Sequence, residues 1–294
     1  MTLEKTASSA KYDYKQSIKS NLSDELINTY LLRPVAGLIV RLLYPTRVTP
    51  NQVTIASTLA GIVAAAFYLQ NSAATTAIAG LMVTLKDLLD SADGQLARAK
   101  EQYSRIGRFL DSIGDFIVNA AVFGVIGWVL TVNTGSMWML VLALLGLIGI
   151  TLRVSYHVFY QSSYLHLEER YQINRITEEI TKDDLASDAM TVSLQKTFQV
   201  IYGWQDRLML RIDTWCRGGN TDQDFMVRWY SDVAGLRFSG LLGMGTELFL
   251  LMLCSVLDAL QTYLIFNILI MNSILFVSIL YRRRFLRRTI SLKG

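Results

Sequence analysis

The chain has 294 residues, a formal net charge of +4 and a mean hydropathy of +0.33, and 52% of its residues are hydrophobic. This composition excludes an ordinary soluble protein and is typical of a chain that crosses a membrane several times. Charged residues make up 18% of the chain, so part of it must lie in water. We expect no nucleic-acid partner, and the two cysteines, Cys216 and Cys254, are too few for a disulfide framework.

The amino terminus, MTLEKTASSAKYDYKQ, lacks the apolar core of a secretory signal peptide. Residues 21–44 then carry apolar residues at helical spacing, with Arg33 and Arg41 between them and Ser23 as an N-cap. This pattern predicts an amphipathic helix on the cytoplasmic membrane interface. Simple anchoring, without a substrate role, is the favoured explanation of such a helix. We assign residues 1–48 to a cytoplasmic N-terminal region.

Stretches of mostly apolar residues follow, each long enough to cross a bilayer as a helix. They predict an all-α membrane protein with six transmembrane helices, at residues 52–70, 74–92, 108–132, 137–160, 237–257 and 259–281. The second and third are the least apolar, because Lys86 and several aspartates lie at their facing ends. Residues 49–160 thus hold the first four helices, and residues 237–294 hold the last two and a basic tail.

The interval between the fourth and fifth helices, residues 161–236, is rich in charged and aromatic residues. It contains the amphipathic run FQVIYGWQDRLMLRIDTW, which ends at Gly218 and Gly219. A segment of this length is too long for a structureless loop in a compact domain. We therefore predict a helical cytoplasmic insertion between helices four and five.

Charges in the connections orient the helices, because Lys and Arg accumulate on the cytoplasmic side. Residues 69–75 and 131–136 carry no charge, whereas residues 94–108 carry Arg98, Lys100, Arg105 and Arg108. Both termini and the 94–108 connection should therefore face the cytoplasm of a bacterial or archaeal cell. The tail YRRRFLRR agrees with this orientation, and we interpret it as a topology determinant that also favours anionic membrane lipids.

Four carboxylates lie around that charged connection. Asp90 and Asp93 are three residues apart and Asp111 and Asp115 are four apart, so each pair projects from one helix face. An Asp at the centre of a membrane helix costs about 2.5–3.5 kcal/mol, which makes these residues a functional site by default. The antiparallel helices bring the pairs together, and their repulsion favours a bound cation. Oxygen ligands without His or Cys favour two Mg²⁺ or Mn²⁺ ions over zinc.

The residues between the two pairs indicate what the metals hold. Gly94 and Gly107 leave backbone without side chains beside the carboxylates, where a bulky ligand can approach. Arg98 supplies a planar cationic group that suits phosphate. Metals, arginine and glycine together predict a pyrophosphate site.

The whole stretch matches the signature DxxDGxxAR(x8)GxxxDxxxD and so resembles the CDP-alcohol phosphotransferase family. The matching positions are Asp90, Asp93, Gly94, Ala97, Arg98, Gly107, Asp111 and Asp115. TPNQVT at residues 49–54 resembles the segment that opens the first membrane helix of the family. Taken without the aspartate signature, TPNQVT is explained by a helix cap with a Pro start signal. The resemblance covers about residues 21–160 and 237–281.

The resemblance implies transfer of a substituted phosphate from a CDP-alcohol, above all CDP-diacylglycerol, to an acceptor alcohol with release of CMP. It implies that Asp90 and Asp111 bridge both metals, that Asp93 binds the first, and that Asp115 binds the second and acts as the general base. It further implies contacts to the CDP-alcohol from Asn51, Gln52, Val53, Thr54, Gly94, Ala97, Arg98, Ser104 and Gly107.

The acceptor site is less well specified by the sequence. Arg153, Lys86 and Arg237 are candidate contacts for the phosphate of an acceptor. Arg153 has an alternative, in which it pairs with the aspartates or extends to the interface. Glu247 is a buried carboxylate with no partner that the sequence identifies. Gly240, Gly243 and Gly245 permit close helix approach, and we expect them at a homodimer contact such as the family often shows.

Alternatives remain for the substrate and for the class of protein. The run ELINTYLLRPVAGLIVRLL with TPNQVT resembles the transferase domains that join CDP-inositol to inositol phosphate, so a polar donor is the alternative to CDP-diacylglycerol. Products of the phosphatidylglycerol-phosphate or phosphatidylinositol-phosphate type stay open. A metal or ion transporter predicts acids spread along several helices, whereas here they are confined to one end. A family member without catalysis is disfavoured, because every signature position is intact.

Overall fold

The computed structural model describes residues 12–17, 25–167 and 189–292, and every element in these ranges is helical. The N-terminal half contains α1 (Tyr14–Ser17), η1 (Asn28–Leu32), α2 (Arg33–Leu43), α3 (Pro50–Leu69), α4 (Ala73–Ala99), α5 (Arg105–Thr134) and α6 (Trp138–Leu167). The C-terminal half contains α8 (Ala189–Arg217), α9 (Gln223–Tyr230), α10 (Val233–Ser239), η3 (Gly240–Leu242), α11 (Met244–Val256), α12 (Leu260–Phe266), η4 (Asn267–Met271), α13 (Asn272–Leu280), η5 (Tyr281–Leu286) and α14 (Arg287–Leu292).

Five stretches of the described chain are long and apolar enough to cross a membrane. They are Pro50–Leu69, Arg105–Thr134, Trp138–Leu167, Val233–Val256 and Leu260–Ile290. The prediction of an all-α fold is confirmed over the described residues, and five of the six expected spans are supported by length and composition. The second expected span lies within α4, which has 27 residues but is not among the five. Its second half carries Lys86, Asp87, Asp90 and Asp93, so the residues of the candidate site themselves reduce its hydropathy.

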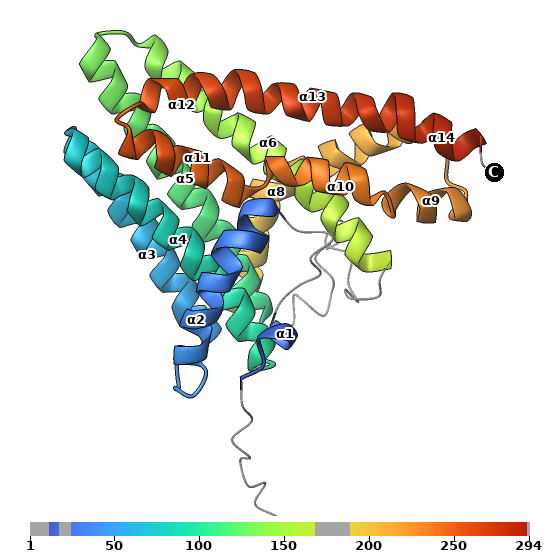
Figure 1. The fold of residues 1–294 in the computed structure, drawn as a ribbon, viewed down its shortest axis with the longest axis horizontal. Coiled ribbons are helices and arrows are strands. Elements are labelled where there is room, and N and C mark those ends of the chain that lie inside the picture. The colour runs from blue at the N-terminus through green and yellow to red at the C-terminus, as the bar shows by residue number, and fades with distance from the viewer. Residues whose placement is uncertain (1–11, 18–24, 168–188, 293–294) are drawn as a thin grey trace, which may run out of the picture.

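Small residues allow the central helices to pack closely. α4 packs against α3 and α11, and α5 packs against α3 and α6. A Cβ atom at Gly61 of α3 would collide with Val118 of α5, and a Cβ at Gly80 of α4 would lie 2.6 Å from Ser255 Cβ of α11. In Figure 1 the connections at residues 70–72, 135–137 and 257–259 lie together at the left of the view. Helices α4 and α5 are therefore joined at the opposite end of the molecule, where the acidic site is.

The N-terminal helices pack onto this bundle. α2 packs against α4 and buries Ala36 and Val40 there, while Leu38 and Leu42 remain exposed. Glu25, which precedes η1, accepts a hydrogen bond from the Thr246 backbone N–H at 3.3 Å. The cap expected at Ser23 lies outside the described residues, as does the part of residues 21–44 before Glu25. The expected amphipathic helix is thus present over α2, on the flank of the helix that carries Asp90 and Asp93.

The glycines at the start of α11 lie close to Glu25 of the same chain. A Cβ at Gly243 would collide with the Glu25 side chain, and a Cβ at Gly245 would lie 3.0 Å from Glu25 Oε2. The position of Glu25 thus requires small residues here, whether or not the protein is a dimer. The expectation of a homodimer contact at these glycines stays a prediction.

The insertion predicted at residues 161–236 is described over residues 161–167 and 189–236, where it is largely helical and packs onto the bundle. The ring of Phe198 in α8 lies 5.4 Å from that of Phe109 in α5, and the Tyr202 hydroxyl donates to the Ser112 carbonyl at 2.6 Å. The fully buried Asp213 carboxylate accepts hydrogen bonds from the side chains of Tyr160, Arg217, Trp229 and Tyr230 at 2.8–3.0 Å. These contacts hold α8 and α9 against α6, and they place α8 beside the turn of α5 that carries Asp111.

Candidate active site

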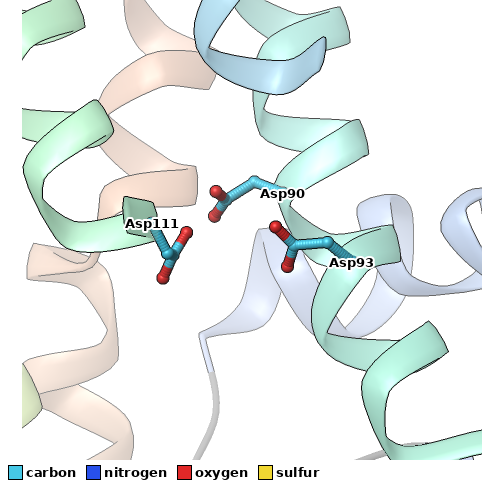
Figure 2. A group of neighbouring side chains, drawn as sticks. All are labelled: Asp90, Asp93 and Asp111. Carbon is cyan, nitrogen blue, oxygen red and sulfur yellow. The ribbon is translucent and has the colours of Figure 1, made fainter. Parts of the chain in front are cut away.

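The acidic site is built where α4 ends and α5 begins. Asp90 and Asp93 come from α4 and Asp111 from α5, and their carboxylate oxygens lie within 4.8 Å of one another. Figure 2 shows the three side chains pointing toward one another across the gap between the two helices. The turn at residues 100–104 reverses the chain, and Ser104 caps α5 by accepting a hydrogen bond from the Gly107 N–H at 3.1 Å. The convergence predicted from the spacing of the aspartates is therefore present for three of the four.

These three carboxylates have the arrangement and chemistry of a site for a divalent cation. Asp93 is buried, and Asp90 and Asp111 are half-buried. Asp111 Oδ1 is shielded from solvent and has no hydrogen-bond partner among the described residues. Carboxylates held this close repel each other unless a cation or a proton lies between them. Because the ligand set is oxygen alone, the residues fit Mg²⁺ or Mn²⁺.

Asp115 is held apart from the other three carboxylates by a lysine. Lys86, which is only 2% exposed, forms an ion pair with Asp115 through its Nζ, and the same Nζ lies 3.7 Å from Asp90 Oδ1. Sequence reasoning placed Lys86 only as a weak candidate at the acceptor. The structure instead places its ammonium group between the expected base and a metal-site carboxylate. The signal in the sequence was the spacing of four residues between Lys86 and Asp90, which puts both on one helix face.

Helix α3 supplies a further contact to the carboxylates. The buried Thr54 hydroxyl donates to Asp93 Oδ2 at 2.5 Å. A Cβ at Gly107 would collide with the Asn51 side-chain oxygen, so only glycine allows Asn51 to lie against the start of α5. Thr54 and Asn51 were predicted as CDP-alcohol contacts. The structure places Thr54 at the Asp93 carboxylate and Asn51 at the start of α5. Thr54 orients a carboxylate of the candidate metal site, a role that the motif alone did not indicate.

Other predicted CDP-alcohol contacts have structural roles in the described chain. Thr49 and Gln52 form a reciprocal capping box at the start of α3, with the Thr49 N–H donating to Gln52 Oε1 at 2.9 Å. Val53 is buried in the apolar cluster that contains Ala92 and Leu96, so its side chain packs in the core and is not available to a ligand. The helix-cap interpretation of TPNQVT is therefore confirmed. The side chains of Gln52 and Val53 position the segment, and only its Asn51 and Thr54 side chains lie toward the site.

Arg98 lies on the next turn of α4. Its guanidinium faces Gly94, where an added Cβ would lie 3.5 Å from Nη1, and its Nε donates to the Ser17 carbonyl at 2.5 Å. The short helix α1 thus fixes one edge of the guanidinium. Ala97 is half-buried on the same helix, one residue before Arg98. The signature arginine and glycine are adjacent, as the interpretation of a phosphate site requires.

Arg153 is placed elsewhere. It is completely buried in α6, where its Nε bonds Glu247 Oε1 at 2.5 Å and its Nη1 bonds Asn272 Oδ1 at 2.6 Å and the Asn267 carbonyl at 3.1 Å. The alternative in which Arg153 pairs with the aspartates or extends to the interface is wrong, because Glu247 of α11 satisfies its charge inside the bundle. This pairing identifies the partner of Glu247, and sequence reasoning missed both asparagines. Arg237, the third acceptor candidate, is exposed on α10.

The segment that carries the site is similar to known proteins. Residues 47–171 match the model of CDP-alcohol phosphatidyltransferase, a range that contains Asn51, the four aspartates and Arg153. The segment that carries the site therefore matches the CDP-alcohol phosphatidyltransferase family. The family match begins three residues before the first α3 residue and ends after α6, so residues 21–46 and 237–281, which we had also related to the family, lie outside it.

Individual relatives match the same part of the chain. Over 133 residues the chain is 35% identical to a "Bifunctional IPC transferase and DIPP synthase" of Thermococcus kodakarensis. The aligned region covers 45% of this chain and 29% of that protein. It is 41% identical over 80 residues to an "Archaetidylinositol phosphate synthase" of Pyrococcus horikoshii, covering 26% of this chain and 40% of the relative. A second "Bifunctional IPC transferase and DIPP synthase", of Aquifex aeolicus, is 32% identical over 122 residues, or 41% and 27% of the two chains. The chain thus spans well under half the length of these relatives.

Proposed function

We propose that this protein transfers a substituted phosphate group from a CDP-alcohol to an acceptor alcohol and releases CMP. The observation that carries the proposal is the complete family signature, three of whose aspartates converge within 4.8 Å at the junction of α4 and α5. The Thr54 hydroxyl bonds Asp93, and Gly94 and Arg98 lie next to each other on the same helix. A nucleotide pyrophosphate is the ligand that such a combination of carboxylates, arginine and accessible backbone suits.

For the donor we propose a polar CDP-alcohol of the CDP-inositol type, with CDP-diacylglycerol as the second candidate. Two of the three relatives described above share the name "Bifunctional IPC transferase and DIPP synthase". The N-terminal run before α3 also resembles transferase domains that join CDP-inositol to inositol phosphate. These two observations support the polar donor over the lipid donor that the family resemblance alone made the first expectation. A role in phospholipid synthesis follows only if the donor or the acceptor is a lipid.

We propose that Asp90, Asp93 and Asp111, together with Asp115, hold two Mg²⁺ or Mn²⁺ ions. When bound, such ions neutralise charge on the pyrophosphate and on the departing CMP. Asp115 then takes the proton from the acceptor hydroxyl. The acceptor oxygen forms a bond to the phosphorus next to the donor alcohol, the bond from that phosphorus to the bridging oxygen breaks, and CMP leaves with the bond electrons. Lys86 holds the Asp115 carboxylate in position through its ion pair.

For the acceptor we propose a phosphorylated alcohol whose phosphate lies near Lys86. Of the three cations expected there, Lys86 is the one among the carboxylates. Arg153 is engaged by Glu247 and two asparagines, although its Nη2 has no hydrogen-bond partner among the described residues. This arrangement supports a structural role for Arg153 in joining α6 to α11 and η4. Arg237 lies exposed on α10 and remains a candidate for the outer edge of the acceptor path.

The setting is part of the proposal. We propose a multi-pass protein of a bacterial or archaeal cell membrane with α4 as a sixth span, with both termini and the acidic site on the cytoplasmic side, and with a homodimer as the functional unit. The uncharged connections at one end and the arginines at the other support this orientation. The length of α4, 27 residues or about 40 Å at 1.5 Å per residue, supports its crossing of the membrane.

The test is an assay of CMP release by the full chain, purified in an uncharged detergent. CDP-inositol and CDP-diacylglycerol are each combined with inositol phosphate, glycerol phosphate and unphosphorylated inositol, with and without Mg²⁺ or Mn²⁺. We expect metal-dependent CMP release with CDP-inositol and a phosphorylated acceptor, and its loss on chelation. CMP release from CDP-diacylglycerol but not from CDP-inositol would overturn the proposal of a polar donor. No metal-dependent CMP release from any pair would overturn the proposed reaction.

A further inference from the structure

A second charged pocket lies at the C-terminal end of α8, between this helix and the arginine-rich tail. It has a volume of about 590 Å³ and is lined by Leu210, Arg211, Thr214, Trp215, Gly218, Gly219, Arg283 and Arg287. Three of the lining residues are arginines, and none is an acid. The proposed transferase chemistry does not use this pocket. Its lining belongs to α8, the turn after α8, η5 and α14, whereas the aspartates belong to α4 and α5.

The three arginines come from two parts of the chain that only the fold brings together. Arg211 lies on α8, whereas Arg283 and Arg287 lie on η5 and α14, near the C-terminal end of the last apolar stretch, Leu260–Ile290. No ion pair joins any of the three to an acidic residue in the described ranges 12–17, 25–167 and 189–292. Cationic groups collected around one cavity repel each other, and an anion between them would relieve that repulsion.

One of these guanidinium groups is already oriented. Arg283 stacks on the Trp215 ring, with its Cζ 3.3 Å from the ring centroid. Its Nη1 is shielded from solvent and has no hydrogen-bond partner among the described residues. A stacked guanidinium keeps its N–H groups in a fixed plane, which is the geometry that binds two phosphate oxygens at once. The stacking therefore prepares Arg283 for an anion.

The turn after α8 makes room for the third arginine. Gly218 and Gly219 adopt φ angles of +68° and +75°, which ends the helix in a left-handed turn. A Cβ at Gly218 would collide with the Arg287 guanidinium, so a side chain there would push Arg287 out of the pocket. Leu210 and Trp215, 42% and 53% exposed, supply an apolar flank. Exposed tryptophan beside arginines at the end of an apolar span is typical of the headgroup level of a membrane.

From these contacts we infer that the pocket between α8 and the tail binds a phosphate group, carried either by an anionic lipid headgroup or by a soluble phosphate ester. Arg211 and Arg287 neutralise the phosphate, and Arg283 donates from its fixed plane. The site would fasten the insertion to the tail whenever the phosphate is bound. The same helix, α8, packs on α5 beside Asp111 through Phe198 and Tyr202.

Native mass spectrometry of the full chain in an uncharged detergent tests the inference. The probes are phosphatidylglycerol, phosphatidylcholine, inorganic phosphate and inositol phosphate. The pocket variant is Arg283→Gln with Arg287→Gln. Its matched control is Arg284→Gln with Arg288→Gln, which removes the same charge from exposed positions of the same tail that do not line the pocket. We expect the pocket variant to bind phosphatidylglycerol about tenfold or more weakly, and the control to stay within about twofold.

Competition by the soluble probes distinguishes the two sources of phosphate. If inositol phosphate or inorganic phosphate displaces phosphatidylglycerol from the wild type, the pocket binds phosphate groups in general. If neither does, the pocket requires the lipid as well as its phosphate. Arg211→Gln provides a second variant on a different element, and it should weaken binding as well. Equal loss in the pocket and control variants, or no loss with Arg211→Gln, would overturn the pocket, since diffuse attraction to the tail predicts both. Absence of phosphate binding by the wild type would also overturn it. The readout is binding alone, so it does not depend on whether the protein releases CMP.

Discussion

At the scale of single residues, the site depends on side chains that hold the signature aspartates in place. Lys86 holds Asp115, and Thr54 holds Asp93. Neither contact is part of the signature, because each joins residues about thirty to forty positions apart in the chain. The signature predicts which carboxylates matter, whereas these contacts decide where each carboxylate points.

Replacement of the proposed base tests its role most directly. Asp115→Asn keeps the shape of the side chain but cannot accept the acceptor proton, so we expect CMP release to fall about 100-fold or more. Binding of the CDP-alcohol, measured by calorimetry, should change little. Asp258→Asn, at an exposed position in the connection between α11 and α12, is the control and should retain full activity. A parallel loss of donor binding in Asp115→Asn would remove the assignment of Asp115 as the base.

Removal of the Thr54 hydroxyl, which bonds Asp93, tests the proposed metal site without replacing any of the proposed metal ligands. Thr54→Val keeps the shape of the residue but loses the donor to Asp93 Oδ2, so the Mg²⁺ concentration needed for half-maximal CMP release should rise about 10–100-fold. Thr54→Ser keeps the hydroxyl and should restore most of the affinity. An unchanged metal requirement in Thr54→Val would show that Asp93 does not depend on this contact.

At the scale of elements, the insertion is attached through a buried polar centre at Asp213. This carboxylate is completely buried, and it satisfies two residues of α9, one of α6 and one of its own helix. A buried hydroxyl or indole N–H without a partner costs free energy, so the side-chain donors of Tyr160, Trp229 and Tyr230 depend on this one acceptor. Burial, with the Asp213 charge, also raises the pKa of the Tyr230 hydroxyl, which stays a neutral donor to the carboxylate at physiological pH.

Loss of this carboxylate should therefore be costly. Asp213→Ala leaves Arg217 as a buried cation without its partner, and we expect the free energy of unfolding to fall by about 3–5 kcal/mol. Asp224→Ala, an exposed acid in the first turn of α9, serves as the control and should cost less than about 1 kcal/mol. Thermal unfolding in detergent measures both. Similar melting temperatures for the two variants would show that Asp213 does not hold the insertion in place.

At the scale of the whole molecule, the question is which end of the bundle faces the cytoplasm. Met137, between α5 and α6, and Tyr103, between α4 and α5, are 67% and 73% exposed and lie at opposite ends of α5. Figure 1 shows the first of these connections at the left end of the molecule, away from the end where α4 meets α5. The two positions are therefore matched probes of orientation.

Labelling with a membrane-impermeant maleimide decides the orientation. In a Cys254→Ala background, Met137→Cys should be labelled in intact cells, and Tyr103→Cys only after the membrane is opened. Cys216 contributes little background, because burial raises the pKa of its thiol to about 11 and leaves almost no reactive thiolate at neutral pH. Labelling of Tyr103→Cys in intact cells would place the acidic site outside the cytoplasm.

The sequence by itself determined the helical, membrane-type architecture and the aspartate pairs, since hydropathy and spacings of three or four residues are local properties of a helix. It also determined the capping box at Thr49 and Gln52, which involves neighbours in the chain. Only the tertiary structure decided that Lys86 binds Asp115, that Glu247 pairs with Arg153, and that α8 and the tail form a pocket. These contacts join segments far apart in the chain, and a buried charge takes whichever partner the packing of the helices brings within reach.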